Sequence, residues 1–283
     1  MKKYIILLEF LVLTSIALAQ NGSRINTMSF NIRYDNPEDG DQNWHKRKEN
    51  VIRMLNFYDL DIIGMQEVLV SQLNYLKENL PEYGVVGVGR ADGKEEGEFT
   101  PVFYKKDRFK LVKTETFWLS ETPEKVSKGW DANLERIVTW VVLNEIKTDK
   151  EVIFLNTHFD HRGVQARIES AKLLKSKISV LAGGRPVILT GDFNSLPDSE
   201  AIQTLVNPKD KNSLNDSKKD AIYTYGPNWT SGGFDTRPFD QRRIIDYIFV
   251  KGISVVNRYA VFTEKLNEIC LSDHCPVFVQ LEL

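Results

Sequence analysis

The chain has 283 residues, of which 42% are hydrophobic and 27% are charged, and its formal net charge is -2 at pH 7. This length and apolar content allow a sizeable buried core. A mildly acidic chain lacks the basic surface with which proteins hold long stretches of nucleic-acid backbone. Nucleic acid is therefore a possible but disfavoured partner. No repeat, low-complexity tract or Pro/Gly/Ser linker divides the sequence, so we expect one main domain.

The N-terminal segment has the layout of a secretory signal peptide. Two lysines precede an apolar stretch over residues 4–18, and the small-residue pattern Ala-Leu-Ala ends at Ala19. We predict a signal peptide over residues 1–19, cleavage after Ala19, export to the periplasm or the medium, and a catalytic domain over residues 20–283. Glu9 interrupts the apolar stretch and keeps a short membrane anchor open as the alternative. No later stretch reaches the roughly 18 apolar residues of a membrane span, so we expect no stable membrane insertion and a monomer.

Short apolar runs rich in Val, Ile and Phe recur along the chain and are bounded by turn residues, which is typical of buried strands. The predicted strands are Ile25–Asn31, Asp61–Gln66, Val102–Tyr104, Ile137–Leu143, Val152–Thr157, Val187–Thr190, Ile244–Val250 and Val277–Leu281. The predicted helices are Lys46–Phe57, Val70–Glu78 and Val164–Leu181, the last ended by Gly183-Gly184. Because several successive strands have no helix between them, the pattern favours two mixed sheets packed face to face with helices outside.

Polar side chains that can bind metals or move protons recur at the ends of these strands. Side chains at one edge of packed sheets converge in space, and clustered carboxylates need a cation. Oxygen ligands suit a hard divalent ion, Mg²⁺ or Mn²⁺, better than zinc. The residues are Asn31, Glu67, His158, Asp160, Asp192, Asn194, Asp246, Asp273 and His274.

Asp246 is the most informative of these acids, because apolar residues surround it in the sequence RIIDYIF. A carboxylate buried in such a strand is costly unless a partner stabilises it. One interpretation is an ion pair with Arg242 or Arg243, or bonds from backbone donors. The other is a carboxylate that orients a histidine and stabilises its protonated form. The residues alone leave both open.

The ordered motifs SFN, MQE, NTH, GDFN, IIDY and SDHCPV resemble the endonuclease/exonuclease/phosphatase superfamily over about residues 25–283. The resemblance implies an α/β (α+β) four-layer sandwich of two packed mixed β-sheets flanked by helices. It also implies hydrolysis of a phosphate ester with a divalent cation. Secreted deoxyribonucleases of the pancreatic type and several phosphatases are members of this superfamily.

The resemblance also implies a role for each matching residue. Glu67 is expected to be the principal metal ligand, with Asn31 and Asp273 near the same ion. His274 is expected to act as general base or to contact the phosphate, and Asp246 to orient it. Asp192 is expected to position or activate the attacking water, while Asn194 and His158 contact the phosphate.

Three further residues are weaker candidates. Glu98 lies in GEFTPVFY, and some family members hold their first histidine with an acid in such a position, so we predict that it orients His158. The alternative is a surface glutamate in the acidic run of residues 95–98. Asp160 and Arg162 follow His158 closely and are predicted to bind substrate, Arg162 through the phosphate. The alternative for both is a place outside the pocket.

The preferred function is a secreted, metal-dependent phosphoesterase acting on a small or lipid-derived phosphodiester or phosphomonoester. The alternatives are a secreted nuclease of the deoxyribonuclease type and a catalytically silent ligand-binding protein on the same scaffold.

The two cysteines, Cys270 and Cys275, flank Asp273 and His274. With one histidine between them they lack the ligands of a zinc site. They form either a disulfide that closes this loop or, as we favour, two free thiols.

Overall fold

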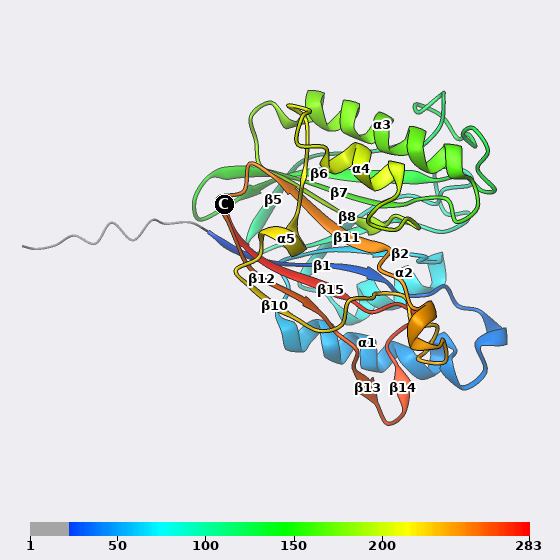
Figure 1. Cartoon of the computed structure of the whole chain (residues 1–283). Helices are drawn as coiled ribbons and strands as arrows, with labels where there is room; N and C mark the ends of the chain where they lie inside the picture. Colours follow the sequence, from blue (N-terminus) through cyan, green and yellow to red (C-terminus); the bar gives the residue numbers. More distant parts are fainter. Residues whose placement is uncertain (1–22) are drawn as a thin grey trace, which may run out of the picture.

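The structure is a computed structural model that describes residues 23–283, so the predicted signal peptide lies outside the described residues. Two sheets form its centre (Figure 1). In spatial order, the seven-stranded sheet contains β10 (Tyr223–Tyr225), β12 (Val255–Val261), β15 (Val277–Glu282), β1 (Arg24–Asn31), β2 (Ile62–Gln66), β4 (Val102–Lys105) and β3 (Tyr83–Val86). The six-stranded sheet contains β5 (Phe109–Trp118), β6 (Ile137–Glu145), β7 (Lys150–His158), β8 (Val187–Asp192), β11 (Asp246–Lys251) and β9 (Asn215–Asp216). A hairpin of β13 (Lys265–Leu266) and β14 (Ile269–Cys270) stands apart.

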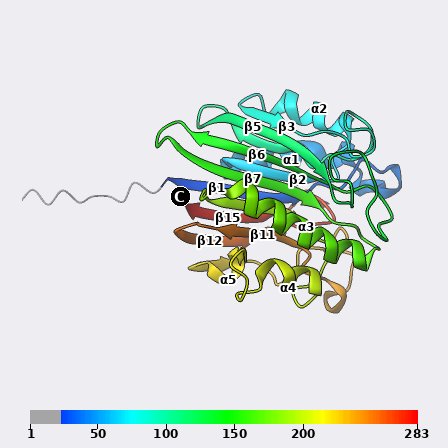
Figure 2. The same ribbon diagram turned by 90° about the horizontal axis from the view of Figure 1, so that it is seen from above.

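Helices cover the outer face of each sheet. In Figure 1, α1 (Trp44–Tyr58) and α2 (Val70–Asn79) lie on the seven-stranded sheet, while α3 (Val164–Ala182) and α4 (Glu200–Val206) lie on the six-stranded sheet. Figure 2 shows the outer face of the six-stranded sheet from above, with α3 and α4 lying over it. Short helices η1 (Pro37–Gln42), α5 (Ser217–Asp220) and η2 (Phe239–Gln241) complete the fold. The predicted four-layer sandwich is therefore confirmed. Among the described residues, no helix has the length and apolarity needed to cross a membrane.

Local sequence signals explain where the main helices begin and end. The side chain of Asn43 accepts a hydrogen bond from the backbone N–H of Lys46 and caps α1, which buries Val51 and Leu55 against the seven-stranded sheet. The longest helix, α3, ends at Gly183, whose φ of +50° is left-handed. Such a conformation favours glycine and stops a helix, as the Gly-Gly pair predicted.

The interface between the sheets is apolar over most of its area and polar near one edge. Its apolar part includes Ile25, Phe154 and Leu281. Near the edge, the Asn156 amide of β7 donates to the carbonyl oxygens of Met65 (2.6 Å) and Pro101 (2.9 Å), and its oxygen accepts from Gln66 Nε2 at 2.6 Å. The two sheets are thus joined by buried hydrogen bonds from one side chain, which fixes their relative position.

A glycine permits this close contact. A Cβ atom on Gly64 in β2 would lie 2.1 Å from Thr190 Oγ1 and 2.7 Å from the Asn156 side chain, both in the opposite sheet. Any other residue at position 64 would push the sheets apart at this point.

Strand direction brings the polar strand ends together. β1 and β2 are parallel, as are β7 and β8, and all four end at the same edge of the sandwich. β11 runs antiparallel to β8, so its first residue, Asp246, pairs with the last residue of β8, Asp192. Residues far apart in the sequence therefore meet at one edge, which we call the catalytic edge.

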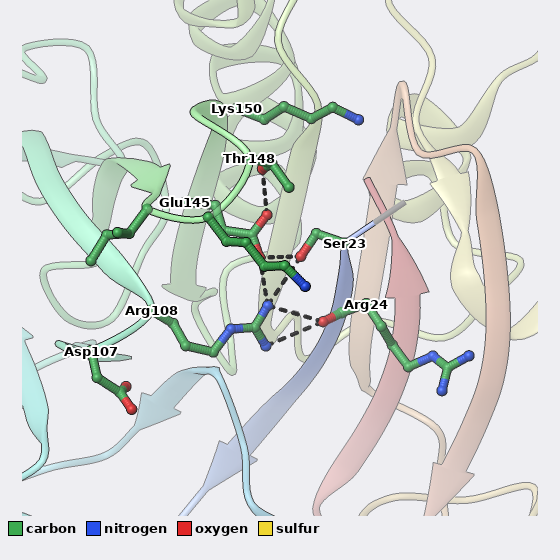
Figure 3. A pocket seen from close by; sticks show the side chains of 9 residues that line it. Ser23, Arg24, Asp107, Arg108, Glu145, Thr148 and Lys150 are labelled. Carbon is green, nitrogen blue, oxygen red and sulfur yellow. Dashed lines mark hydrogen bonds and ion pairs between the residues drawn. The ribbon is translucent and has the colours of Figure 1, made fainter. Parts of the chain in front are cut away.

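The opposite end of the sandwich holds a cavity of about 760 Å³ around the starts of β1 and β7 (Figure 3). Arg108 crosses it and bonds the Glu145 carboxylate (2.6 Å) of one sheet and the Asp61 carboxylate (2.7 Å) of the other. Lys150 donates to the Leu283 carbonyl oxygen at 3.1 Å. These charged groups are engaged within the chain and stabilise the end of the sandwich away from the catalytic edge.

Some predicted element boundaries were wrong. The apolar run from Ile244 was expected to be strand throughout, but β11 begins only at Asp246. The preceding Ile245 instead accepts a hydrogen bond from the backbone of Phe193 through its carbonyl oxygen. Two longer strands, β5 and β12, were not predicted at all.

Candidate active site

A carboxylate and a histidine form the best-defined pair at the catalytic edge. Asp246 Oδ2 lies 2.9 Å from Nδ1 of His274, and both residues are at least nine-tenths buried. Thr230 Oγ1 donates to the same oxygen at 2.6 Å and accepts the backbone N–H of Asp246 at 3.1 Å. Three contacts therefore fix the carboxylate and the ring that it orients.

This geometry distinguishes the two interpretations of Asp246. Arg242 pairs with Asp235 at 2.7 Å, and Arg243 donates to the carbonyl oxygens of Asp240 and Arg242. Among the described residues neither arginine contacts Asp246, whose partner is His274. The second oxygen of Asp246 is buried and has no hydrogen-bond partner in the described part of the chain.

The carboxylates around His274 stabilise its charged form. Burial lowers the pKa of this imidazole, but the Asp246, Asp192 and Asp273 carboxylates outweigh it and raise the pKa well above 6.5. The three carboxylates therefore favour the protonated form of His274. A protonated imidazole cannot accept a proton from water, so of the two predicted roles the structure favours contact with the phosphate.

Asp192, the last residue of β8, lies between the two histidines. Its Oδ2 is 3.6 Å from His158 Nε2 and 3.8 Å from His274 Nδ1, and its Oδ1 accepts the backbone N–H of Asn194 at 2.9 Å. Burial and the neighbouring Asp246 carboxylate raise the pKa of Asp192. A raised pKa makes this carboxylate a better proton acceptor, which suits the activation of water.

His158 ends β7 and is neutral. Burial, followed by the nearby Arg136 guanidinium, lowers its pKa to about 3. The side-chain amide nitrogen of Asn194 donates to the Phe159 carbonyl oxygen (3.0 Å) and lies 3.1 Å from His158 Nε2. Because the carbonyl contact fixes which atom of Asn194 is the donor, Nε2 of His158 accepts and its proton is on Nδ1.

Glu98 lies on the Nδ1 side of His158, at 3.6 Å. Both of its oxygens are held by Arg90, at 2.7 and 2.9 Å. Its side chain is only 16% exposed, so the alternative of a surface glutamate is wrong. The contact to His158 is longer than a hydrogen bond, and the Arg90 pair is the stronger interaction.

Asp160 and Arg162 differ in burial. Asp160 is buried, and its carboxylate accepts the backbone N–H groups of Arg162 (2.9 Å), Gly163 (2.8 Å) and Leu134 (3.2 Å). Burial opposes its ionisation, but backbone hydrogen bonds hold the pKa of Asp160 well below its usual range. Asp160 thus orders the loop after β7, whereas the Arg162 side chain is exposed. Substrate binding by either residue stays a prediction.

The predicted metal ligands occupy the same edge. Asn31 Nδ2 donates to Glu67 Oε1 (2.9 Å) and to Asp192 Oδ2 (3.0 Å), and so joins the two carboxylates. Donor atoms of Glu67, His158 and Asp192 lie within 4.8 Å of one another, as do those of Asp192, Asp246 and His274. Asp273 is in neither group; its carboxylate accepts from Ser272 Oγ at 3.2 Å.

This donor set fits a hard divalent cation. Carboxylate oxygens dominate it, and Glu67 retains 13% side-chain exposure toward solvent. Glu67 is the residue best placed to hold such an ion. Asn31 presents its nitrogen to the carboxylates, and its oxygen accepts the backbone N–H of Arg33 at 3.0 Å. Direct ligation by Asn31 would therefore require its amide to rotate.

Two residues of the site have a left-handed backbone conformation. Glu67 directly follows β2 with a φ of +60°, and Asn194 follows β8 with a φ of +46°. A left-handed glutamate is uncommon and costs of order 1–3 kcal/mol. Surrounding hydrogen bonds hold both residues in this conformation, and thereby aim their side chains at the catalytic edge.

Sequence reasoning missed several residues of the site: Thr230, Arg33, Arg90 and Arg136. Arg33 lies 3.9 Å from Glu67 and pairs with Asp39 at 3.0 Å. Arg136 is buried, pairs with Asp160 and lines a small hollow with Arg90, Glu98 and His158. None of the four had a local signal in the sequence: Thr230 is one of several hydroxyl residues in the polar loop that precedes the IIDY motif.

The cysteines are both free thiols. Cys270 is buried and Cys275 half-buried, and burial raises the pKa of each. The loop that carries Asp273 and His274 is instead held by backbone bonds. Gly232 and Gly233 donate to the Asp273 carbonyl oxygen at 3.0 and 2.9 Å, and Cys275 donates to the Thr230 carbonyl oxygen at 2.6 Å.

A four-layer sandwich with acids and two histidines gathered at one sheet edge places the chain among the sandwich-fold phosphoesterases. The chain belongs to the Endonuclease/Exonuclease/phosphatase family, whose sequence profile matches residues 28–274. The predicted family is thereby confirmed.

Two solved structures from Bacteroides are similar over nearly their whole length. An endonuclease/exonuclease/phosphatase from Bacteroides vulgatus is 41% identical, with a TM-score of 0.88, and the match covers 92% of this chain and 99% of that one. A mannosyl-6-phosphatase from Bacteroides thetaiotaomicron is 40% identical, with a TM-score of 0.85, and the match covers 91% and 99%.

Sequence relatives extend to eukaryotes. Human tyrosyl-DNA phosphodiesterase 2 is 28% identical over 179 residues, which are 62% of this chain and 43% of that protein. The chain spans between 37% and 50% of the length of the first five such relatives, so it corresponds to part of each.

Proposed function

We propose that this protein is an exported, divalent-metal-dependent phosphatase that removes the phosphate from a phosphorylated sugar, with mannose 6-phosphate as the first candidate. The observation that carries the reaction is the position of Asp192 between His158 and His274. The candidate substrate comes from the 40% identical mannosyl-6-phosphatase, which matches over 99% of its length. This proposal narrows the expected small phosphate ester to a phosphomonoester of a sugar.

The residues support an in-line attack by water. Asp192 takes the proton of the attacking water, whose oxygen bonds to phosphorus as the bond from phosphorus to the sugar oxygen breaks. The His274 imidazolium donates to a phosphoryl oxygen and offsets the charge that develops there. Asn194 and His158 lie on the other side of Asp192 and bond each other at 3.1 Å, so contact of either with the phosphate requires that bond to be exchanged. The products are inorganic phosphate and the free sugar hydroxyl, protonated by solvent.

Glu67 and its neighbours would hold the metal ion. A bound Mg²⁺ or Mn²⁺ supplies positive charge that stabilises the transferring phosphoryl group and the leaving oxygen. Asn31 keeps Glu67 and Asp192 together through its two donated bonds, and so keeps the cation site beside the proton acceptor.

Phosphate release from a substrate panel tests the reaction. The purified protein is assayed with Mg²⁺ or Mn²⁺ on mannose 6-phosphate, other sugar phosphates, bis-p-nitrophenyl phosphate and DNA, beside a His274→Ala variant. We expect the highest kcat/KM on a sugar monoester and a large loss in the variant. Preferential cleavage of DNA would support the nuclease alternative. Equal inactivity of both proteins on all substrates would contradict the enzyme proposal.

Export is tested separately by N-terminal sequencing of the protein recovered from its source cells. Signal-peptide cleavage predicts a new N-terminus at Gln20, whereas a membrane anchor predicts an intact chain in the membrane fraction.

A further inference from the structure

A group of exposed aromatic side chains lies on the outer edge of the seven-stranded sheet. Phe57, at the end of α1, is 80% exposed, and Tyr223 and Tyr225 of β10 are 66% and 78% exposed. All three line one groove of about 480 Å³. Large aromatic side chains exposed together on a folded protein mark an interaction surface more often than isolated ones do.

A second hollow continues this groove. It has a volume of about 310 Å³ and includes Trp229 and Phe239, with Phe262 shared between the two hollows. The Arg242 guanidinium packs against Trp229 (4.4 Å) and Phe239 (4.1 Å). We call the whole surface the aromatic tract; it consists of Phe57, Tyr223, Tyr225, Phe262, Trp229 and Phe239.

The aromatic tract leads to the loops of the catalytic edge. β10 is parallel to β12, and its last residue, Tyr225, comes five positions before Thr230, which bonds Asp246. The second hollow is lined by the segment from Cys270 to Pro276, which includes His274. The tract is therefore continuous with the segments that carry the catalytic pair.

Polar groups along the aromatic tract are amides, hydroxyls and carboxylates as well as cations. The first groove contains Asn26, Gln280 and Thr224, and the second contains Asp235 and Glu264. The two hollows are lined by three cations, Arg242, Lys265 and Arg258, and by three carboxylates, Asp235, Glu264 and Asp273, and both Arg242 and Lys265 pair with Asp235. This balance disfavours a polyanion such as nucleic acid, which needs unpaired positive charge.

A neutral oligosaccharide fits this chemistry. A pyranose ring offers an apolar C–H face that packs on an aromatic ring, and hydroxyls at its rim that bond amides and carboxylates. We propose that the aromatic tract binds a neutral carbohydrate chain and so holds a glycan whose phosphorylated sugar is cleaved at the catalytic edge. The link to cleavage rests on the proposed function, whereas carbohydrate binding does not.

Direct binding tests the proposal without any hydrolysis. Fluorescently labelled manno-, gluco- and xylohexaose are titrated with the full protein and with a Tyr223→Ala/Tyr225→Ala variant, and anisotropy is recorded. A Val164→Ala/Val180→Ala variant is the matched control, because these two side chains are 59% and 79% exposed on α3 of the opposite outer face. We expect at least one hexasaccharide to bind, about tenfold more weakly to the tyrosine variant and equally to the control.

A second measurement links binding to substrate choice. The ratio of kcat/KM for a terminally phosphorylated hexasaccharide to that for mannose 6-phosphate is expected to fall five- to tenfold in the tyrosine variant, by about the loss in affinity. Absence of binding to every hexasaccharide, or equal binding by the tyrosine variant, would overturn the proposal. So would a wild-type dimer that the tyrosine variant converts to monomer, since a second copy would then cover the tract. Binding without phosphatase activity would instead refute only the proposed function.

Discussion

Removal of the charge on Asp246 tests the central feature of the site. Asp246→Asn keeps the shape of the side chain and an oxygen that can accept from His274 and Thr230. At the 2.9 Å separation, the charge interaction is worth about 6 kcal/mol for an effective dielectric constant of about 20. The retained hydrogen bonds and the relieved desolvation offset part of this. We therefore expect a loss of about 2–4 kcal/mol in transition-state stabilisation, or a kcat about 30- to 1000-fold lower.

The same substitution predicts a change in pH dependence. In the wild type, His274 holds its proton up to its raised pKa, so the activity that depends on the imidazolium is present at pH 7 and is lost as the pH rises through that value. Without the Asp246 charge the pKa falls, and the loss of activity moves toward neutral pH.

Steady-state kinetics over pH 5–10, together with NMR titration of the histidine ring protons, measure both effects. The exposed Asp240→Asn variant is the control for the loss of one carboxylate, since its side chain lies at the surface. A kcat within about threefold of wild type and an unshifted His274 pKa in Asp246→Asn would refute the reasoning.

Three further substitutions test the support of this pair by Thr230, the predicted metal ligand Glu67 and the contact between the two sheets. Thr230→Val removes the hydroxyl that donates to Asp246 and should lower kcat about tenfold, whereas Thr230→Ser should restore it. Glu67→Gln should raise the Mg²⁺ concentration for half-maximal activity about tenfold or more, and Mn²⁺ binding followed by electron paramagnetic resonance should weaken in parallel; an unchanged metal requirement would show that Glu67 is not a ligand. Asn156→Ala removes three buried hydrogen bonds to the seven-stranded sheet and should lower the free energy of unfolding in urea by about 3 kcal/mol or more, and a loss below about 1 kcal/mol would contradict the role assigned to this amide.

Most of the strands that were predicted correctly are buried on both faces. β7 and β8 lie between a helix layer and the other sheet, so they read as continuous apolar runs. β5 was missed because it is the edge strand of its sheet and most of its central residues are exposed, which leaves no such run. The same reasoning applies to β10, whose three residues are all exposed.

Some residues of the candidate site could be predicted from the sequence and others could not. Asp192, Asp246 and His274 carry their signal locally, because acids and histidines at the ends of apolar strands are unusual in sequence. The arginines have no such local signal, because nothing in the sequence distinguishes them from the many Lys and Arg residues at the surface. Only the fold brings Arg90 beside Glu98 in a bidentate pair, and Arg136 against the carboxylate of Asp160.

The residues of the candidate site are divided between the two sheets that the buried Asn156 amide joins. Asn31 and Glu67 come from one sheet, whereas His158, Asp192 and Asp246 come from the other. Neither sheet alone contains a complete site, so a partly folded chain with separated sheets is inactive even if every strand is formed. Residual activity during denaturation therefore reports the fraction of molecules in which the two sheets are still packed together. Circular dichroism reports the secondary structure that remains, so comparing the two would reveal whether the sheets separate before they unfold.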